Sequence, residues 1–229
     1  MNRLKCIILF LSYLLLFLIT GCQNQNKTYP KVITSERLKS LSENDIFAIS
    51  ELACIEIDKR AVIPADDHAL SQRLNKIAKT LPTKANNIEI NYKVYINTEP
   101  NAWSTANGCI RVNSGLIKLL NDNELQAVLA HEQAHIALKH AVSLFLQAPY
   151  IEFTDNIDEL VIIAKEEVAQ QYEVEADNYA FDLLVSQNID PMSLVEMLVK
   201  VPIHSTNNPT SHPSSKKRIT NIINRINGK

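Results

Sequence analysis

The sequence predicts one α+β domain that is mainly helical, with a small sheet or hairpin beside a central helix. Apolar residues recur at helical spacing along most of the chain, and only the stretch 88–112 is rich in alternating β-forming residues. The length of 229 residues, with 46% hydrophobic and 21% charged residues, suits a single globular domain. A formal charge of −2 argues against a nucleic-acid binder, which would need a cationic surface.

The first 22 residues differ in composition from the rest. Arg3 and Lys5 precede an apolar run over 6–19, and a polar stretch follows Cys22. This order is typical of a signal peptide, here over 1–21. The tetrapeptide that ends at Cys22 resembles a bacterial lipobox, in which the cysteine is acylated and becomes the first residue. The alternative is an uncleaved signal anchor with a chance cysteine.

Both interpretations place the rest of the chain outside the cytoplasm. We expect a lipidated tether over 22–33 and a folded domain over 34–229, held on the bacterial cell envelope by lipid on Cys22. Gln23 resembles the outer-membrane sorting pattern, so in a bacterium with two membranes the protein would sit on the outer membrane and face the periplasm.

Export also bears on the cysteines. Once residues 1–21 are removed and Cys22 carries lipid, Cys54 and Cys109 remain. Two thiols in an oxidising compartment are expected to form a disulfide. The alternative is a pair of buried, unpaired cysteines.

Apolar stripes and a β-rich run define the elements of the first half. Helices are expected over about 34–60 and 70–81, and a proline follows each of them. An alternating run predicts a strand over about 88–97. Asn107-Gly108 lies between two β-prone runs, which is typical of a hairpin turn.

The second half is predicted to be helical. Asn121 and Glu124 resemble a capping box at the start of a long helix. A polar loop is expected over 203–211. The predicted helices cover 114–120, 122–147, 157–187, 191–202 and 213–227.

The chemistry is indicated first by His131-Glu132-Gln133-Ala134-His135, which falls on the predicted helix 122–147. Residues four apart on a helix lie one turn apart on the same side, so the two imidazoles can meet at one metal ion. Glu132 is offset from both and can act on a water molecule without binding the metal. Chance gives only roughly 0.01 such strings in a chain of this composition. The alternative is a surface helix with two solvated histidines.

A catalytic zinc ion needs a third protein ligand and one open position. The predicted helix 157–187 offers Glu173, Glu175 and Asp177 beside two alanines. Glu173 and Asp177 share a side of the helix, and Glu175 points away from both. One of the first two could bind the metal while the other accepts a hydrogen bond from a ligand imidazole. Spacing alone leaves open which does which.

These strings resemble the Ste24/HtpX-type zinc metallopeptidases, a family of gluzincins with a zincin-like fold. The resemblance extends to the segments around 101–116 and to His212-Pro213 with Arg218. It is nearest to the small bacterial lipoprotein members of the LoiP type, which share the lipobox, Asn101-Ala102-Trp103, the string 107–112 and a cysteine near position 54. That last likeness supports a bridge between Cys54 and Cys109.

The resemblance implies a role for each candidate residue. Zn²⁺, one per chain, would be bound by His131, His135 and Glu173, and Asp177 would orient a ligand. Glu132 would be the catalytic base that activates water for peptide hydrolysis. His140 is expected on the opposite face of the helix and is not counted as a ligand.

Two further features bear on the substrate. The hairpin strand with Asn101, Ala102 and Trp103 is expected to pair with an extended peptide, or else only to close the small sheet. His212 would stabilise an oxyanion, take the fourth metal position at rest, or lie unengaged on the surface. Arg218 would pair with an active-site carboxylate or face water, and the run Lys216-Lys217-Arg218 is expected on a helix surface.

The function expected from the resemblance is zinc-dependent endoproteolysis of unfolded or damaged envelope proteins on a membrane surface. Partners would be such substrates, the membrane and possible other envelope proteins, with no nucleic acid. One alternative is a zinc-bound chaperone or binding module that does not cleave. Glu132 disfavours it, because a pure binder needs no base beside the metal. A structural lipoprotein is the third candidate.

Overall fold

The computed structural model describes residues 32–153, 160–162, 166–201 and 215–228. The expected signal peptide 1–21, Cys22, most of the tether and His212 lie outside this part of the chain. Within it, no helix has the length and apolar content that a membrane crossing requires.

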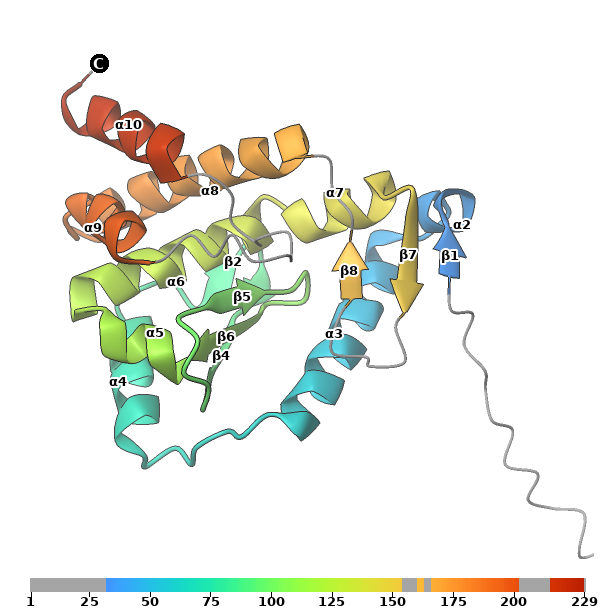
Figure 1. Cartoon of the computed structure of the whole chain (residues 1–229), viewed down its shortest axis with the longest axis horizontal. Coiled ribbons are helices and arrows are strands. Elements are labelled where there is room, and N and C mark those ends of the chain that lie inside the picture. The colour runs from blue at the N-terminus through green and yellow to red at the C-terminus, as the bar shows by residue number, and fades with distance from the viewer. Residues whose placement is uncertain (1–31, 154–159, 163–165, 202–214, 229) are drawn as a thin grey trace, which may run out of the picture. The chain divides into compact units, whose positions relative to one another are not determined.

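The described chain is mainly helical with short strands, so the predicted α+β class is confirmed (Figure 1). In chain order the elements are β1 (Val32–Thr34), α2 (Ser35–Lys39), α3 (Glu43–Arg60), α4 (Ala69–Ala78), β2 (Lys84–Ala85), β3 (Ile88–Glu89), β4 (Asn91–Tyr95), β5 (Ala102–Ser104), β6 (Cys109–Asn113), α5 (Ser114–Leu119), α6 (Asp122–Ala137), α7 (His140–Gln147), β7 (Tyr150–Phe153), β8 (Leu160–Ile162), α8 (Glu166–Ser186), α9 (Met192–Lys200) and α10 (Ser215–Ile226).

Helix α6 occupies the centre of the main core. It lies between the sheet that contains β5 and helix α8, and α10 packs on α8 and α9 (Figure 1). Three of its alanines, Ala127, Ala130 and Ala134, are fully buried, as are Ala176 and Ala180 of α8. Such small side chains let two helix backbones approach closely. The carboxylates of α8 can therefore reach the imidazoles of α6.

The sheet beside α6 has the strand order β4-β6-β5. Strand β6 is parallel to β4 and antiparallel to β5, so β5 is an edge strand. The predicted hairpin turn is present over 105–108, closed by a hydrogen bond from Gly108 N–H to the Thr105 carbonyl. Gly108 has φ of +90°, and a Cβ there would lie 2.1 Å from the Glu89 carbonyl oxygen. Only glycine fits this turn.

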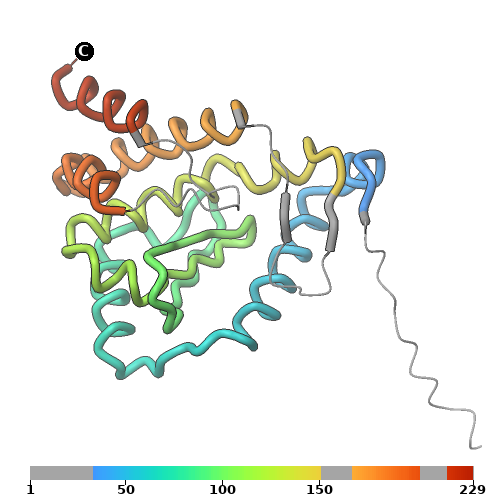
Figure 2. Tube along the Cα trace, viewed as in Figure 1, coloured from blue at the N-terminus to red at the C-terminus, as the bar shows by residue number. Residues whose placement is uncertain are grey.

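Helix α3 is attached to this sheet by Cys54 and Asp58. Cys54 and Cys109 of β6 are at bonding distance, which makes them the disulfide that the cysteine count predicts. Asp58 accepts hydrogen bonds from Arg111 and from Tyr95. Figure 2 shows the connecting segment 61–68 that leads from α3 to α4.

The prediction of one continuous helix over 34–60 is wrong. The chain forms β1 and α2, turns at 40–42, and then starts α3. Ser42 caps α3 by accepting from the Asp45 N–H, while the Asp45 carboxylate accepts from the Ser42 N–H. This capping box starts a new helix at 43. Strand β1 also takes residues 32 and 33 from the expected tether.

The prediction of one helix over 122–147 is also wrong. Its start is confirmed by the capping box of Asn121 and Glu124, but α6 ends at Ala137 and α7 begins at His140. Between them Lys139 takes a left-handed conformation with φ of 56°. That conformation costs roughly 1–2 kcal/mol for a residue with a Cβ. An ion pair of 2.7 Å between Lys139 and Glu43 of α3 stabilises the break.

The helix expected over 157–187 starts only at Glu166, because β8 occupies part of the segment before it. Strand β8 pairs with β7, and β7 pairs with β1. The described residues thus form a second three-stranded sheet and the two-stranded pair β2-β3, where one small sheet was expected. These strands are only two to four residues long, and β1 pairs with a strand more than 100 residues away, so local alternation does not reveal them.

Candidate functional site

Helix α6 presents its His-Glu-x-x-His string beneath α8. His131 and Glu132 are each 3% exposed, and His135 is more open, with 16% of its side-chain surface accessible. The helical spacing brings Nε2 of His131 to 3.0 Å from Nε2 of His135. Both rings therefore turn the same nitrogen toward one point.

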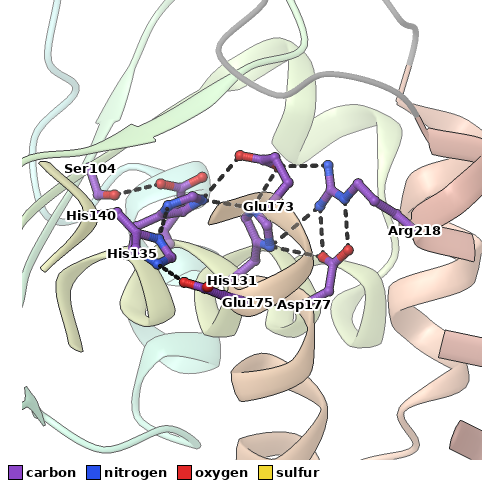
Figure 3. Close-up of polar contacts among 9 residues, drawn as sticks. Ser104, His131, His135, His140, Glu173, Glu175, Asp177 and Arg218 are labelled. Carbon is purple, nitrogen blue, oxygen red and sulfur yellow. Dashed lines mark hydrogen bonds and ion pairs between the residues drawn. The ribbon is translucent and has the colours of Figure 1, made fainter. Parts of the chain in front are cut away.

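Glu173 of α8 supplies a third atom at this point (Figure 3). Its Oε2 lies 3.4 Å from Nε2 of His131, and its Oε1 lies 3.4 Å from Nε2 of His135. Ligand atoms of these three residues all lie within 4.8 Å of one another. The spacing of the sequence left open whether Glu173 or Asp177 is the third candidate ligand. In the structure, Glu173 is the one whose carboxylate lies beside the two Nε2 atoms.

The spacing of these atoms fits a metal ion. Four ligands at about 2.0–2.1 Å in a tetrahedron are about 3.3 Å apart, close to the separations of 3.0, 3.4 and 3.4 Å found here. Two imidazoles and one carboxylate form the donor set of catalytic zinc sites that keep one position for water. The three residues could hold such an ion without a change of backbone.

Asp177 and Arg218 support the His131 side of the site. Nδ1 of His131 lies 3.1 Å from Oδ1 of Asp177. Arg218 of α10 donates two hydrogen bonds of 2.7 Å to the Asp177 carboxylate and forms a 2.7 Å ion pair with Oε2 of Glu173. Arg218 is 4% exposed, so the expectation of a surface position for it is wrong, whereas Lys216 and Lys217 are exposed. Of the two alternatives for Arg218, pairing with a carboxylate or facing water, the structure therefore has the first.

The pKa values reflect these contacts. Burial lowers the pKa of His131, but hydrogen bonds to Asp177 and Glu173 outweigh burial and raise it to about 9. Burial lowers the pKa of His135. Burial raises the pKa of Asp177, but hydrogen bonds from Arg218 and His131 bring it below its usual value. Burial lowers the pKa of Arg218, but its hydrogen bonds to Asp177 outweigh burial and raise the pKa above its usual value. A proton and a metal ion compete for the imidazoles, as at other histidine metal sites.

Glu132 faces the edge strand. The hydroxyl of Ser104 on β5 donates a hydrogen bond of 2.7 Å to Oε2 of Glu132. Sequence reasoning missed Ser104, although its place two residues after Ala102 puts both on the same face of the strand. The contact holds the carboxylate between the metal ligands and the strand that a peptide could join.

His140 and Glu175 support the His135 side, which sequence reasoning also missed. Nδ1 of His140 lies 2.9 Å from Nδ1 of His135, and its Nε2 lies 3.2 Å from Oε2 of Glu175 (Figure 3). The prediction that His140 lies on the opposite face is wrong because the helix breaks before it. The group of residues that could hold a metal ion consists of His131, His135 and Glu173. Burial, followed by the charge on His135, lowers the pKa of His140 to about 4.

The remaining candidates lie in or next to β5, or outside the described chain. Ala102 and Trp103 belong to β5, and Asn101 precedes it and accepts a hydrogen bond from Asn113 N–H through its carbonyl. The Trp103 ring meets the edge of Tyr95 at a centroid distance of 6.0 Å. His212 and Cys22 fall on residues that the structure does not describe.

Comparison with known proteins agrees with this geometry. Residues 64–154 match peptidase family M48. The chain is 35% identical to Metalloprotease YcaL of Escherichia coli (strain K12) over 236 residues, which cover 91% of this chain and 92% of that protein. It is 32% identical to Metalloprotease LoiP of the same organism over 233 residues, with 91% and 92% covered. Protease HtpX of Nitrosococcus oceani is 40% identical over 57 residues, 23% of this chain and 19% of that protein.

Proposed function

This chain belongs to peptidase family M48 and is a metalloprotease, and from that premise we propose that it is a zinc-dependent endopeptidase for unfolded proteins. The observation that carries the proposal is the convergence of His131, His135 and Glu173 beside Glu132. We further propose that lipid on Cys22 holds the enzyme at the bacterial envelope, where damaged proteins are its substrates.

His131, His135 and Glu173 would hold the metal ion, and Asp177 would orient the His131 ring. A zinc ion bound there supplies Lewis acidity, which lowers the pKa of a coordinated water toward neutrality and polarises the scissile carbonyl. Glu132 takes the proton of the attacking water and later passes it to the leaving amine. Ser104 holds Glu132 in place for both transfers through its 2.7 Å hydrogen bond.

Strand β5 would bind the substrate. It is the edge of its sheet, and Ser104 at its end already contacts Glu132. An extended peptide that pairs with β5 would therefore present a backbone carbonyl close to the proposed base. Pairing of this kind reads the backbone more than the side chains, which favours unfolded chains over a strict cleavage motif.

The catalytic test is Glu132→Gln in the purified protein, with casein as the unfolded substrate. We expect zinc to remain bound while hydrolysis falls by about 10²–10⁴-fold or more, because the carboxylate that accepts the proton is gone. Glu196→Gln, on an exposed part of α9, is the matched control and should keep wild-type activity. Wild-type rates in the Glu132 variant would exclude its role as the base.

The anchoring test is Cys22→Ala in cells supplied with radiolabelled palmitate. We expect the label to be lost and the protein to leave the membrane fraction, because the acylated side chain is absent. Retention of both label and membrane association in the variant would reject lipidation at Cys22.

The substrate class is tested by comparing cleavage of one protein in its folded and unfolded forms. Equal rates would contradict strand pairing.

A further inference from the structure

His140 is a buried imidazole with a hydrogen-bonding partner on each ring nitrogen. It is 3% exposed, and its ring stacks on Tyr172 with a centroid distance of 4.3 Å and an interplanar angle of 6°. Nδ1 faces Nδ1 of His135 at 2.9 Å, and Nε2 faces Oε2 of Glu175 at 3.2 Å. Gln171 also donates a hydrogen bond of 2.7 Å to Oε1 of Glu175.

These contacts determine where the ring protons lie when a metal is bound. Nε2 of His135 points at the metal group, so that nitrogen must offer a lone pair and the proton of the neutral ring must be on Nδ1. An Nδ1–H on His135 can donate to His140 only if Nδ1 of His140 is unprotonated. The proton of His140 then lies on Nε2, where it donates to the Glu175 carboxylate. Only this direction satisfies both hydrogen bonds.

We propose that His140 is a positioning residue of the metal centre. Its Nδ1 accepts a hydrogen bond from Nδ1–H of His135, and its Nε2–H donates one to Glu175. The proposal rests on the proposed function, since it assumes that His135 binds a metal. A ligand histidine commonly donates its second N–H to a fixed acceptor, which sets the ring orientation and strengthens the metal bond. Asp177 is the acceptor for Nδ1–H of His131, and His140 is the acceptor for Nδ1–H of His135.

The backbone around His140 supports this role. In an unbroken helix, residues five apart would differ by about 140° in direction, so the two rings would not meet. The left-handed Lys139 turns the chain so that His140 faces His135. The conformation is unfavourable for a lysine, and the Lys139–Glu43 ion pair helps to keep it. The ring of His140 is then held by stacking on Tyr172, whose hydroxyl accepts from Gln147.

The test compares zinc binding by three full-length proteins: wild type, His140→Phe and His140→Asn. Phenylalanine keeps the stacking on Tyr172 and removes both nitrogens. Asparagine gives up the stacking but places a carbonyl oxygen near the position of Nδ1, so it can still accept from His135. Zinc affinity is measured by competition with a chelator of known affinity, so the readout does not depend on catalysis.

We expect His140→Phe to lose about 10–100-fold in zinc affinity, and His140→Asn to recover most of that loss. In ¹⁵N spectra of the zinc-loaded wild type, Nδ1 of His135 should carry the proton. Thermal unfolding of each protein in excess chelator reports any loss of stability that is unrelated to metal. A purely structural His140 would predict the opposite order, with asparagine worse than phenylalanine because it loses the stacking.

The outcomes distinguish a failure of the proposed role of His140 from a failure of the proposed function. If the wild type binds zinc and both variants bind it equally well, the role of His140 is wrong while the proposed function stands. The same holds if His140→Asn binds no better than His140→Phe. If the wild type itself binds no zinc, the proposed function fails, and the role of His140 fails with it.

Discussion

Two groups of charged side chains in this protein each surround a buried guanidinium, but they differ in their balance of charge. In the metal site, Glu132, Glu173 and Asp177 are gathered near Arg218. When both imidazoles are neutral, as metal binding requires, three carboxylates against one guanidinium leave two negative charges, which matches a divalent cation. Near the C-terminal end of α3, the single carboxylate of Asp58 forms ion pairs with both Arg111 and Lys93.

The difference explains what each group needs in order to be stable. A buried charge without a partner is costly, so a cluster with excess negative charge is completed by a cation. The Asp58 group has its cations within the protein, and Arg111 also donates to the carbonyls of Asn91 and Ile110. Zinc should therefore change the stability effects of substitutions in the first group and leave those in the second unchanged.

The largest effect is expected for Arg218→Met. The change leaves Glu173 and Asp177 buried without their guanidinium, which should lower the unfolding free energy by about 3–5 kcal/mol. Denaturant unfolding measures it, and saturating zinc should reduce the loss because the ion supplies positive charge. Lys217→Met, exposed on the same helix, is the control and should change stability by less than about 0.5 kcal/mol. A similar loss in both variants would contradict the role of Arg218.

Removal of zinc from the wild type should have the next largest effect. An ion that binds only the folded chain adds about 2.7 kcal/mol at a free concentration 100 times its dissociation constant. Unfolding with and without chelator measures this gain. Glu173→Gln should abolish most of the gain, because a neutral amide is a weak zinc ligand. An undiminished gain in that variant would place the stabilising ion elsewhere.

Asp58→Asn should cost about 2 kcal/mol at neutral pH, with or without zinc. Burial raises the pKa of Asp58, but hydrogen bonds from Arg111, Lys93 and Tyr95 hold it well below its ordinary value of 3.8. A carboxyl whose pKa is lowered by folding contributes fully above its unfolded pKa and loses that contribution as the pH falls below it. The difference in unfolding free energy between wild type and variant should therefore be smaller at pH 2 than at pH 6.

Asp67→Asn, in the exposed turn before α4, is the control for this substitution and should be nearly neutral at both pH values. If zinc altered the cost of Asp58→Asn as strongly as that of Arg218→Met, the proposed contrast between the two groups would be lost.

The smallest effect is expected for Ser42→Ala, which belongs to neither group. It removes the hydroxyl that caps α3 and should cost about 1 kcal/mol, while Ser42→Asp should retain most of the cap. Thermal unfolding without zinc gives the comparison. A cost above that of Arg218→Met would mean that the buried charges contribute less than a single helix cap.

The metal-binding group was predictable to the extent that its geometry is local. The spacing of His131 and His135 on one helix fixes their relation whatever surrounds them. Glu173 is on another helix, and the residues alone did not separate it from Asp177; the resemblance did. Arg218 comes from a third helix, so its burial depends on how α10 packs, which local periodicity does not encode.

The helix breaks were missed for two different reasons. The break at 40–42 has a local signal, because Ser42 and Asp45 form a capping box that the sequence contains. The break before His140 has no glycine or proline, and it is stabilised by the distant Glu43. Since the missed break is what turns His140 toward His135, the supporting partner of that ligand could not be found from helical spacing.

The most direct measurement is a crystal structure of the zinc-loaded protein with anomalous data at the zinc absorption edge. We predict one zinc peak at about 2.0–2.2 Å from Nε2 of His131, Nε2 of His135 and a carboxylate oxygen of Glu173. A zinc ion bound by other residues, or by the two histidines with Glu173 turned away, would contradict the proposed metal centre.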